Sequence, residues 1–183
     1  MTNPNPQTLQ RAQQGDNAAI AELYDQYQVI VYRYLYYRTC DAQAAEDLTS
    51  ELFLRMIRSL ADYRPSSGSF QAWIFQIARN LAIDHYRRNS THPNTFLEEN
   101  LVTGEATASG SVERNLNAIT LRQALTQINE DQRDVIVLRF VAGMPIAEVA
   151  QALQKSQDAI KALQRRGLVT LRKLLTDWEI TYA

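Results

Sequence analysis

The chain has 183 residues, enough for one domain or two small ones, and 45% of them are hydrophobic, so a buried core can form. Its formal net charge of −1 excludes a globally positive surface, so nucleic-acid binding would have to come from local patches and should be weak for the isolated protein. One cysteine, Cys40, excludes an internal disulfide and a cysteine-rich zinc site, and two histidines, His85 and His92, suggest neither a metal nor a cofactor.

The residue composition favours helices throughout. Gly and Pro are scarce, Ala, Leu, Gln and Arg are abundant, and few segments alternate apolar and polar residues as a half-buried strand would. We therefore predict an all-α fold. No apolar run approaches the ~20 residues of a membrane span. The first residues, MTNPNPQTLQ, lack the basic and apolar parts of a signal peptide, so we expect a cytoplasmic protein.

Three helices are predicted in the first 62 residues. A short helix over 7–14 should end at Gly15, and Asp16 or Asn17 can cap a second over 18–39. The tyrosine-rich run at 32–38 fits a helix packed on two sides, or a nucleic-acid surface. Asp41 can cap a third helix over 42–62.

This third helix is acidic in its first half and basic in its second half. Glu46, Asp47 and Glu51 precede Arg55 and Arg58. The order of signs suits the helix dipole, and this is one explanation of the pattern. The other is an acidic, partly apolar patch that docks a basic partner surface.

After a loop at 63–68, residues 69–89 form the most informative predicted helix. Its apolar face follows the helical spacing and comprises Phe70, Trp73, Ile74, Ile77, Leu81 and His85. Its other residues are amides, charged groups and two aromatics expected to be accessible: Gln71, Gln76, Arg79, Asn80, Asp84, Arg87, Arg88, Phe75 and Tyr86. Such groups can contact bases and phosphates, and aromatics can stack on unpaired bases. The alternative is a core helix with a solvated polar face.

A polar segment divides the chain. Residues 90–111 are rich in Ser, Thr, Asn and Gly, and we predict a flexible linker between a domain at 1–89 and a domain at 112–183. Helices are expected over 112–128, over 130–142 with Asn129 as its cap and Gly143 as its end, over 146–154, and from a cap at Ser156 to about 178.

The last two helices have the shape of a helix-turn-helix. The second one presents polar and basic residues along its first half, the part that enters the major groove: Gln157, Asp158, Lys161, Gln164, Arg165 and Arg166. Lys161, Arg165 and Arg166 suit phosphates and guanine, and the two glutamines suit adenine. The alternative is a helical hairpin with an ordinary basic face.

Taken together, these segments resemble those of the extracytoplasmic-function (ECF) sigma factors of bacterial RNA polymerase, which are group 4 of the sigma-70 family. The matching segments are GDNAAIAELYDQY, AEDLTSELFLRMIRSL, FQAWIFQIARNLAIDHYRR, NEDQRDVIVLRFVAGMPIAEVAQAL and AIKALQRRGLVTLRKLL. They span nearly all of residues 15–175 in the order of the family. One departure is the turn before the last helix, where Gln154 and Lys155 stand in place of the glycine that is common there.

The resemblance implies two helical domains, sigma region 2 and sigma region 4. Asp47, Leu48, Glu51 and Phe53 would contact the clamp helices of core polymerase. Asn80 would contact a flipped base of the promoter −10 element, with Phe70 near the mouth of the preceding loop and Arg79, Asp84, Arg87 and Arg88 as further strand contacts. The helix-turn-helix would read the −35 element through Gln157, Lys161, Gln164, Arg165 and Arg166.

The resemblance also implies an anti-sigma protein as regulator. The protein would not be an enzyme, since the sequence shows no catalytic constellation of Ser, Cys, His and Asp residues and no phosphate-binding glycine loop. The alternative function is a stand-alone helix-turn-helix transcriptional regulator. A regulator should bind its DNA site alone, whereas a sigma factor should need core polymerase.

Overall fold

In the computed structural model, the described residues are 3–65, 68–90 and 120–182, and they are helical with no strand among them. This confirms the all-α prediction. The helices are α1 (Pro6–Gln13), α2 (Asn17–Thr39), α3 (Ala42–Ser59), the 3₁₀ turn η1 (Leu60–Asp62), α4 (Phe70–Ser90), α6 (Glu130–Ile136), the π-helical turn η3 (Val137–Val141), α7 (Ile146–Leu153) and α8 (Gln157–Tyr182). Residues 120–127 are also helical.

Local capping sets the helix starts that the sequence predicted. The Asp16 carboxylate accepts hydrogen bonds from the backbone N–H groups of Ala18 and Ala19 at the start of α2. Asp41 does the same for Ala44 in α3, and Asn129 for Asp131 in α6. Each side chain thereby satisfies N–H groups that a helix start leaves without a partner.

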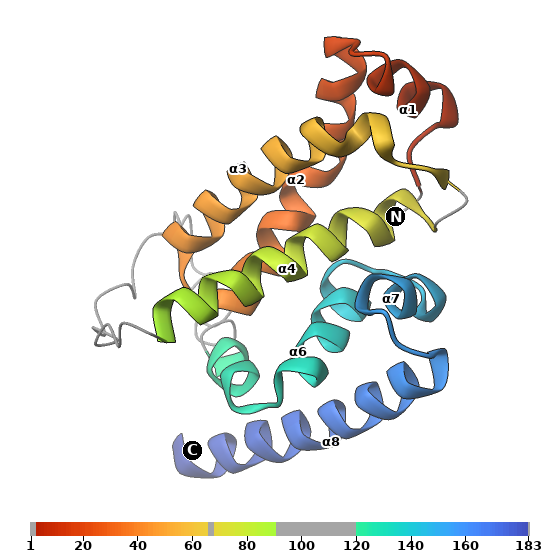
Figure 1. Cartoon of the computed structure of the whole chain (residues 1–183). Coiled ribbons are helices and arrows are strands. Elements are labelled where there is room, and N and C mark those ends of the chain that lie inside the picture. Colours follow the sequence, from red (N-terminus) through yellow and green to blue (C-terminus); the bar gives the residue numbers. More distant parts are fainter. Residues whose placement is uncertain (1–2, 66–67, 91–119, 183) are drawn as a thin grey trace, which may run out of the picture.

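The N-terminal bundle comprises α1 to α4. In Figure 1, α3 and α4 run side by side, α2 lies behind them, and α1 packs at the end of α2. Large apolar side chains fill the space between these helices, including Leu23, Tyr27, Leu52, Met56 and Leu81, each of which is fully buried. These side chains form the N-terminal part of the hydrophobic core.

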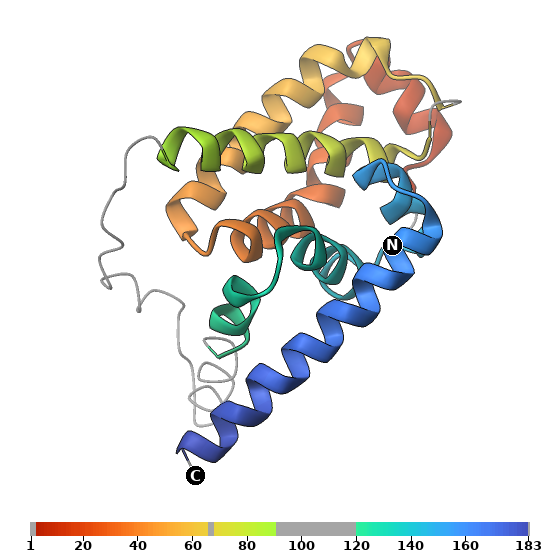
Figure 2. The same ribbon diagram turned by 60° about the horizontal axis from the view of Figure 1, so that its bottom comes forward.

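The C-terminal bundle comprises residues 120–127 and α6 to α8. The long helix α8 forms its outer edge, and α6 and α7 lie between α8 and the N-terminal bundle (Figures 1 and 2). The prediction of one continuous α-helix over 130–142 is wrong about its second half. The α-helix ends at Ile136 and a π-helical turn follows, in which the Ala142 N–H donates to the Val137 carbonyl. Gly143 then ends the segment with a φ of +68°.

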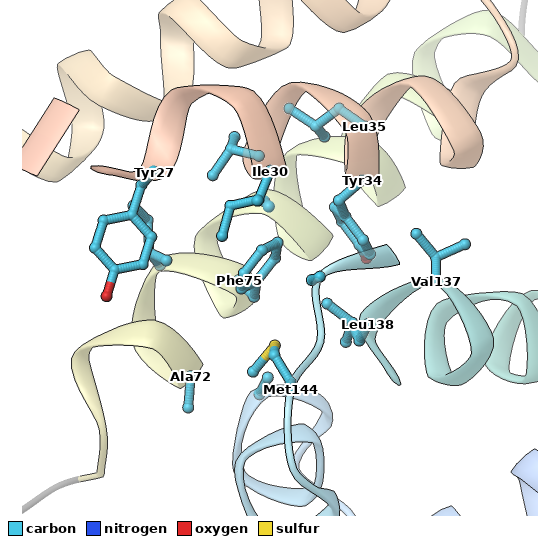
Figure 3. Close-up of a cluster of buried hydrophobic side chains, with 14 of the residues drawn as sticks. Tyr27, Ile30, Tyr34, Leu35, Ala72, Phe75, Val137, Leu138 and Met144 are labelled. Atoms are coloured by element: carbon cyan, nitrogen blue, oxygen red, sulfur yellow. The ribbon is translucent and has the colours of Figure 1, made fainter. Parts of the chain in front are cut away.

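The two bundles pack directly on each other. Helix α7 lies on α4, and η3 lies on α2. In the close-up of Figure 3, Tyr34 and Phe75 from the N-terminal bundle point toward Leu138 and Met144 from the C-terminal bundle. All four side chains are buried. The apolar core therefore continues across the boundary between the bundles.

This contact corrects two sequence interpretations. The sequence predicts an accessible Phe75 and assigns Gln71 to the polar face of its helix, but both residues are fully buried. The reason is that α4 is covered on two sides, by its own bundle and by α7, so its buried surface is wider than one amphipathic stripe. The predicted linker at 90–111 lies outside the described residues, apart from the backbone of Ser90.

Candidate nucleic-acid interface

A small groove between α3 and α4 holds Asn80, the residue expected to contact a flipped base. The groove encloses about 320 Å³ and is lined by Arg55, Arg58, Ser59, Ile77 and Asn80. Asn80 itself is exposed. An amide on an apolar floor, flanked by two guanidinium groups, is chemically suited to one base and its adjoining phosphates.

The other residues expected at the −10 element occupy different environments. Asp84, Arg87 and Arg88 are exposed on the last turns of α4. Arg79 points the other way, toward the C-terminal bundle, where it pairs with Asp131 and Asp134. Arg79 is therefore on the covered side of α4, while Asn80 is on its open side.

Phe70, the first residue of α4, is buried at the end of the N-terminal bundle. Its ring centroid lies 5.3–5.4 Å from those of Tyr27, Tyr63 and Trp73. The Tyr63 hydroxyl donates to the carbonyl of Gly68, which fixes the loop to this aromatic cluster. Phe70 thus positions the start of α4, and its contact with DNA stays a prediction.

The four residues expected to contact core polymerase divide into two pairs. Asp47 and Glu51 are accessible on the outside of α3, whereas Leu48 and Phe53 are buried. A second groove of about 460 Å³ runs beside the first and includes Asp47, Leu48 and Glu51 in its lining, with Arg55 shared between the two grooves. The structure therefore brings the acidic patch and the Asn80 groove onto one face.

The helix-turn-helix is formed by α7 and α8. Its turn passes through Gln154, whose φ of +53° and ψ of +44° are left-handed, and the Gln154 and Lys155 N–H groups donate to carbonyls of α7. This is the conformation that glycine adopts without steric cost, so the turn keeps its geometry with a glutamine in place of the usual glycine.

The residues expected to read the −35 element lie along the first half of α8. Gln157, Lys161, Arg165 and Arg166 are exposed, and Lys161 pairs with Asp158 one turn away. Gln164 is half-buried, and its side-chain oxygen accepts a hydrogen bond from Arg139 of η3. The arrangement presents a row of cationic and polar groups to one side.

Sequence reasoning missed three residues near these sites. It assigns Arg55 and Arg58 only to the basic half of α3, and it gives Arg139 no role. Their proximity to Asn80 and Gln164 depends on how α3 packs on α4 and η3 on α8. The one signal in the sequence is the three-residue spacing of Arg55 and Arg58, which places both on the same face of one helix.

A network of charged groups connects the two bundles. The Asp134 carboxylate lies 3.0 Å from Nε of Arg38 and 3.3 Å from Nε of Arg79, and it accepts a 2.9 Å hydrogen bond from the Tyr34 hydroxyl. Arg38 and Asp134 are each 1% exposed. Burial raises the pKa of the Asp134 carboxyl, and the neighbouring Arg38 and Arg79 guanidinium groups oppose that rise.

None of the helices in the described part of the chain is long and apolar enough to cross a membrane. Within the same residues, no group of three or more His, Cys, Asp and Glu side chains is placed to hold a metal ion.

A helical bundle with a groove on one face, followed by a helix-turn-helix bundle, defines a class of two-part transcription proteins, and comparison with known families agrees. The family model for sigma-70 region 2 matches residues 23–92, and the model for sigma-70 region 4 matches residues 124–173. Together they cover more than half of the chain. The first contains the Asn80 groove and the acidic patch, and the second contains the helix-turn-helix.

Curated relatives specify the class further. The chain is 40% identical over 171 residues to the ECF RNA polymerase sigma factor BldN of Streptomyces coelicolor, covering 92% of this chain and 65% of the relative's length. It is 35% identical over 162 residues to the ECF sigma factor SigX of Bacillus subtilis, covering 82% of this chain and 80% of SigX. The chain belongs to the ECF RNA polymerase sigma factors.

Solved structures share the fold. A structure of CnrH in complex with the cytosolic domain of CnrY matches with a TM-score of 0.72 and 21% identity, over 93% of this chain and 96% of that one. The sigma factor RpoE of Bartonella quintana, solved with the anti-sigma factor NepR, matches with a TM-score of 0.70 and 20% identity, over 85% and 96%.

Proposed function

We propose that this protein directs core RNA polymerase to specific promoters, reads their −35 and −10 elements, and helps to open the −10 element without catalysing a reaction itself. Its place of action would be the cytoplasm, with the polymerase. The observation that carries this proposal is the Asn80 groove on the same face as an acidic patch, in a chain that also carries a helix-turn-helix.

The Asn80 groove supports recognition of a base that has left the DNA stack. Flipping a base out costs a few kcal/mol, which contacts in the pocket must offset. The Asn80 amide can donate to and accept from a base edge, Ile77 offers an apolar surface, and Arg55 and Arg58 can pair with phosphates. A recess of about 320 Å³ admits a single base, and a duplex would not fit into it.

The α8 face supports recognition of duplex DNA. Lys161, Arg165 and Arg166 are exposed near the N-terminal half of this helix, directly after the turn. This is the half of a recognition helix that contacts base edges in the major groove. Gln157 and Gln164 are the amide candidates for adenine, and Arg139 holds the second of them.

The acidic patch on α3 supports docking to core polymerase. Asp47 and Glu51 present carboxylates, and Leu48 and Phe53 beneath them pack the helix against its bundle. Complementary charge accelerates association and selects the partner surface. The clamp helices of the largest polymerase subunit are the partner that the family resemblance implies.

An anti-sigma protein is the proposed regulator. The fold relative RpoE of Bartonella quintana forms a complex with the anti-sigma factor NepR. For this chain, such a protein would have to cover the α3–α4 face, the α8 face, or both, because these are the surfaces proposed to bind polymerase and DNA.

Run-off transcription from a genomic fragment library tests the proposal. Purified core polymerase is assayed with and without this protein, and new discrete start sites that depend on the protein are expected. Absence of new transcripts, together with sequence-specific binding of DNA by the protein alone, would instead support a stand-alone helix-turn-helix regulator.

A further inference from the structure

The contact between the bundles contains a buried carboxylate that belongs to one bundle and is neutralised by the other. Asp134 is in α6, whereas its partners Arg38, Tyr34 and Arg79 are in α2 and α4. Arg38 also pairs with Glu130 at 2.9 Å, and Arg133 donates to the Arg38 carbonyl. These groups form one network across the boundary, which we call the Asp134 latch.

The latch and its neighbours occupy cationic groups that could otherwise face DNA. Arg79, one residue before Asn80, is only 25% exposed and is held by Asp131 and Asp134. Lys155, in the turn of the helix-turn-helix, pairs with Asp131 at 3.1 Å. One acidic turn of α6 therefore neutralises a cation from each of the two proposed DNA-binding elements.

Other groups in the contact between the bundles have opposite effects on its stability, some favouring and some disfavouring the packed state. Tyr34, Phe75, Leu138 and Met144 bury apolar surface at its centre (Figure 3). At the α7 end, among the described residues, neither polar atom of the buried Gln71 amide has a hydrogen-bond partner, and the same is true of the Tyr27 hydroxyl and one oxygen of Glu148. Within the latch, Nε and one terminal nitrogen of Arg38 also lack a hydrogen-bond partner, as does Nε of Arg133, although Arg38 Nε lies 3.0 Å from the Asp134 carboxylate as an ion pair. Buried polar atoms without partners disfavour the packed state at both places, so closure depends on the apolar surface and on the pairing of charges around Asp134.

We propose that the Asp134 latch holds the chain in a closed state and that the latch must open before Arg79 is available to DNA. Removal of one member of a buried ion pair leaves the other charges uncompensated as long as they remain buried. In a closed chain without the Asp134 charge, Arg38 would keep only Glu130 and Arg79 only Asp131 as an ion-pair partner, and both of these carboxylates are much more exposed than Asp134. Opening exposes both guanidinium groups to water, so loss of Asp134 shifts the population toward the open state.

Distance measurement on the full chain tests the latch without polymerase or DNA. Spin labels are attached at Ala21→Cys in α2 and Lys173→Cys in α8, both exposed positions in different bundles, and pulsed electron–electron double resonance gives the distance distribution. Cys40→Asn removes the native thiol, since asparagine tolerates the left-handed φ of +58° at this position. The matched charge control is Glu22→Gln, an exposed carboxylate paired only with groups of its own bundle.

The expected result is one narrow distance for the parent and for Glu22→Gln, and its partial loss to longer distances in Asp134→Asn. An unchanged distribution in a helical, folded Asp134→Asn protein would overturn the latch, as would a parent that lacks the narrow distance. If Asp134→Asn does not fold, Arg79→Gln replaces it, because Arg79 is a partly exposed member of the latch and its loss removes one of the two guanidinium groups that pair with Asp134. A folded Arg79→Gln chain with the parental distribution would equally overturn the proposal.

The second part of the proposal, that opening precedes DNA contact, rests on the sigma-factor function. The affinity of a ligand for a minor open state is reduced by the fraction of open molecules. Asp134→Asn should therefore lower the protein concentration needed for half-maximal run-off transcription, and an equal or higher concentration would overturn this part. Absence of transcription with the parent protein would instead be a failure of the proposed function, and the distance measurement would still stand.

Discussion

The two bundles present their proposed DNA-contacting residues in different ways. The N-terminal bundle holds Asn80 in a recess between two helices, whereas the C-terminal bundle carries Lys161 and Arg165 along the outside of one helix. A recess admits a single unstacked base and an open helix face matches a duplex groove, so the difference supports the proposal that the first bundle contacts a flipped base and the second contacts duplex DNA.

The largest expected effect concerns the core that the two bundles share. Phe75 is fully buried, lies 5.4 Å from the Tyr34 ring by centroids, and faces the C-terminal bundle. Phe75→Ala should lower the free energy of unfolding by about 3–5 kcal/mol, because it leaves a cavity in that core. Urea denaturation measures the change.

Phe140→Ala is the matched control for that experiment, since Phe140 is 57% exposed and should change stability little. A loss below about 1 kcal/mol for Phe75→Ala would mean that the site collapses readily or that the bundles do not share a core. In the second case, the two bundles would be independent folding units.

The next effect concerns the acidic patch on α3, which is proposed to contact core polymerase and not DNA. Glu51→Arg reverses a carboxylate that pairs with Arg55 at 2.7 Å, so it adds positive charge where a basic partner is expected. We expect affinity for core polymerase to fall about tenfold, equivalent to about 1.4 kcal/mol. Fluorescence anisotropy with purified core measures this affinity.

Glu22→Arg provides the control on the neighbouring helix α2, where Glu22 is also exposed. Parental affinity in a Glu51→Arg protein with an unchanged helical signal would remove α3 from the docking surface. Equal losses in both variants would point to net charge as the cause.

The smallest expected effect is a change in stability at the turn between α7 and α8 of the C-terminal bundle. Gln154 has a left-handed backbone, which costs a residue with a Cβ atom about 1 kcal/mol. Gln154→Gly should therefore raise the free energy of unfolding by about that amount, while Gln154→Ala, which keeps the Cβ, should not. Lower stability of Gln154→Gly in thermal denaturation would show that the glutamine side chain contributes more than the strain removes.

The sequence predicted the parts of this fold that local chemistry determines. Asp16, Asp41 and Asn129 cap the helices for which they were proposed, and Gly143 ends its segment with a positive φ. Such signals depend on a few neighbouring residues, so they can be read without knowledge of the fold.

The contact between the bundles was not predictable in the same way. Asp134 stands 55 residues from Arg79 and 100 from Tyr34, and nothing near it in the sequence distinguishes it from a solvated carboxylate. The predictions for Phe75 and Gln71 were wrong for the same reason, because a helix covered on two sides has no single apolar stripe. The α3–α4 groove likewise depends on how two helices pack.

The division of labour between the bundles is tested most directly by transcription from a promoter library that is randomised upstream of one start site. Asn80→Ala should weaken base discrimination at one position of the downstream element, and Arg165→Ala at the upstream element, each by about 1–3 kcal/mol at the affected base. Asn17→Ala, an exposed asparagine at the start of α2, should leave both elements unchanged. Unaltered base preference in Asn80→Ala, or changes at the same positions in both variants, would contradict the assignment of single-strand and duplex recognition to separate bundles.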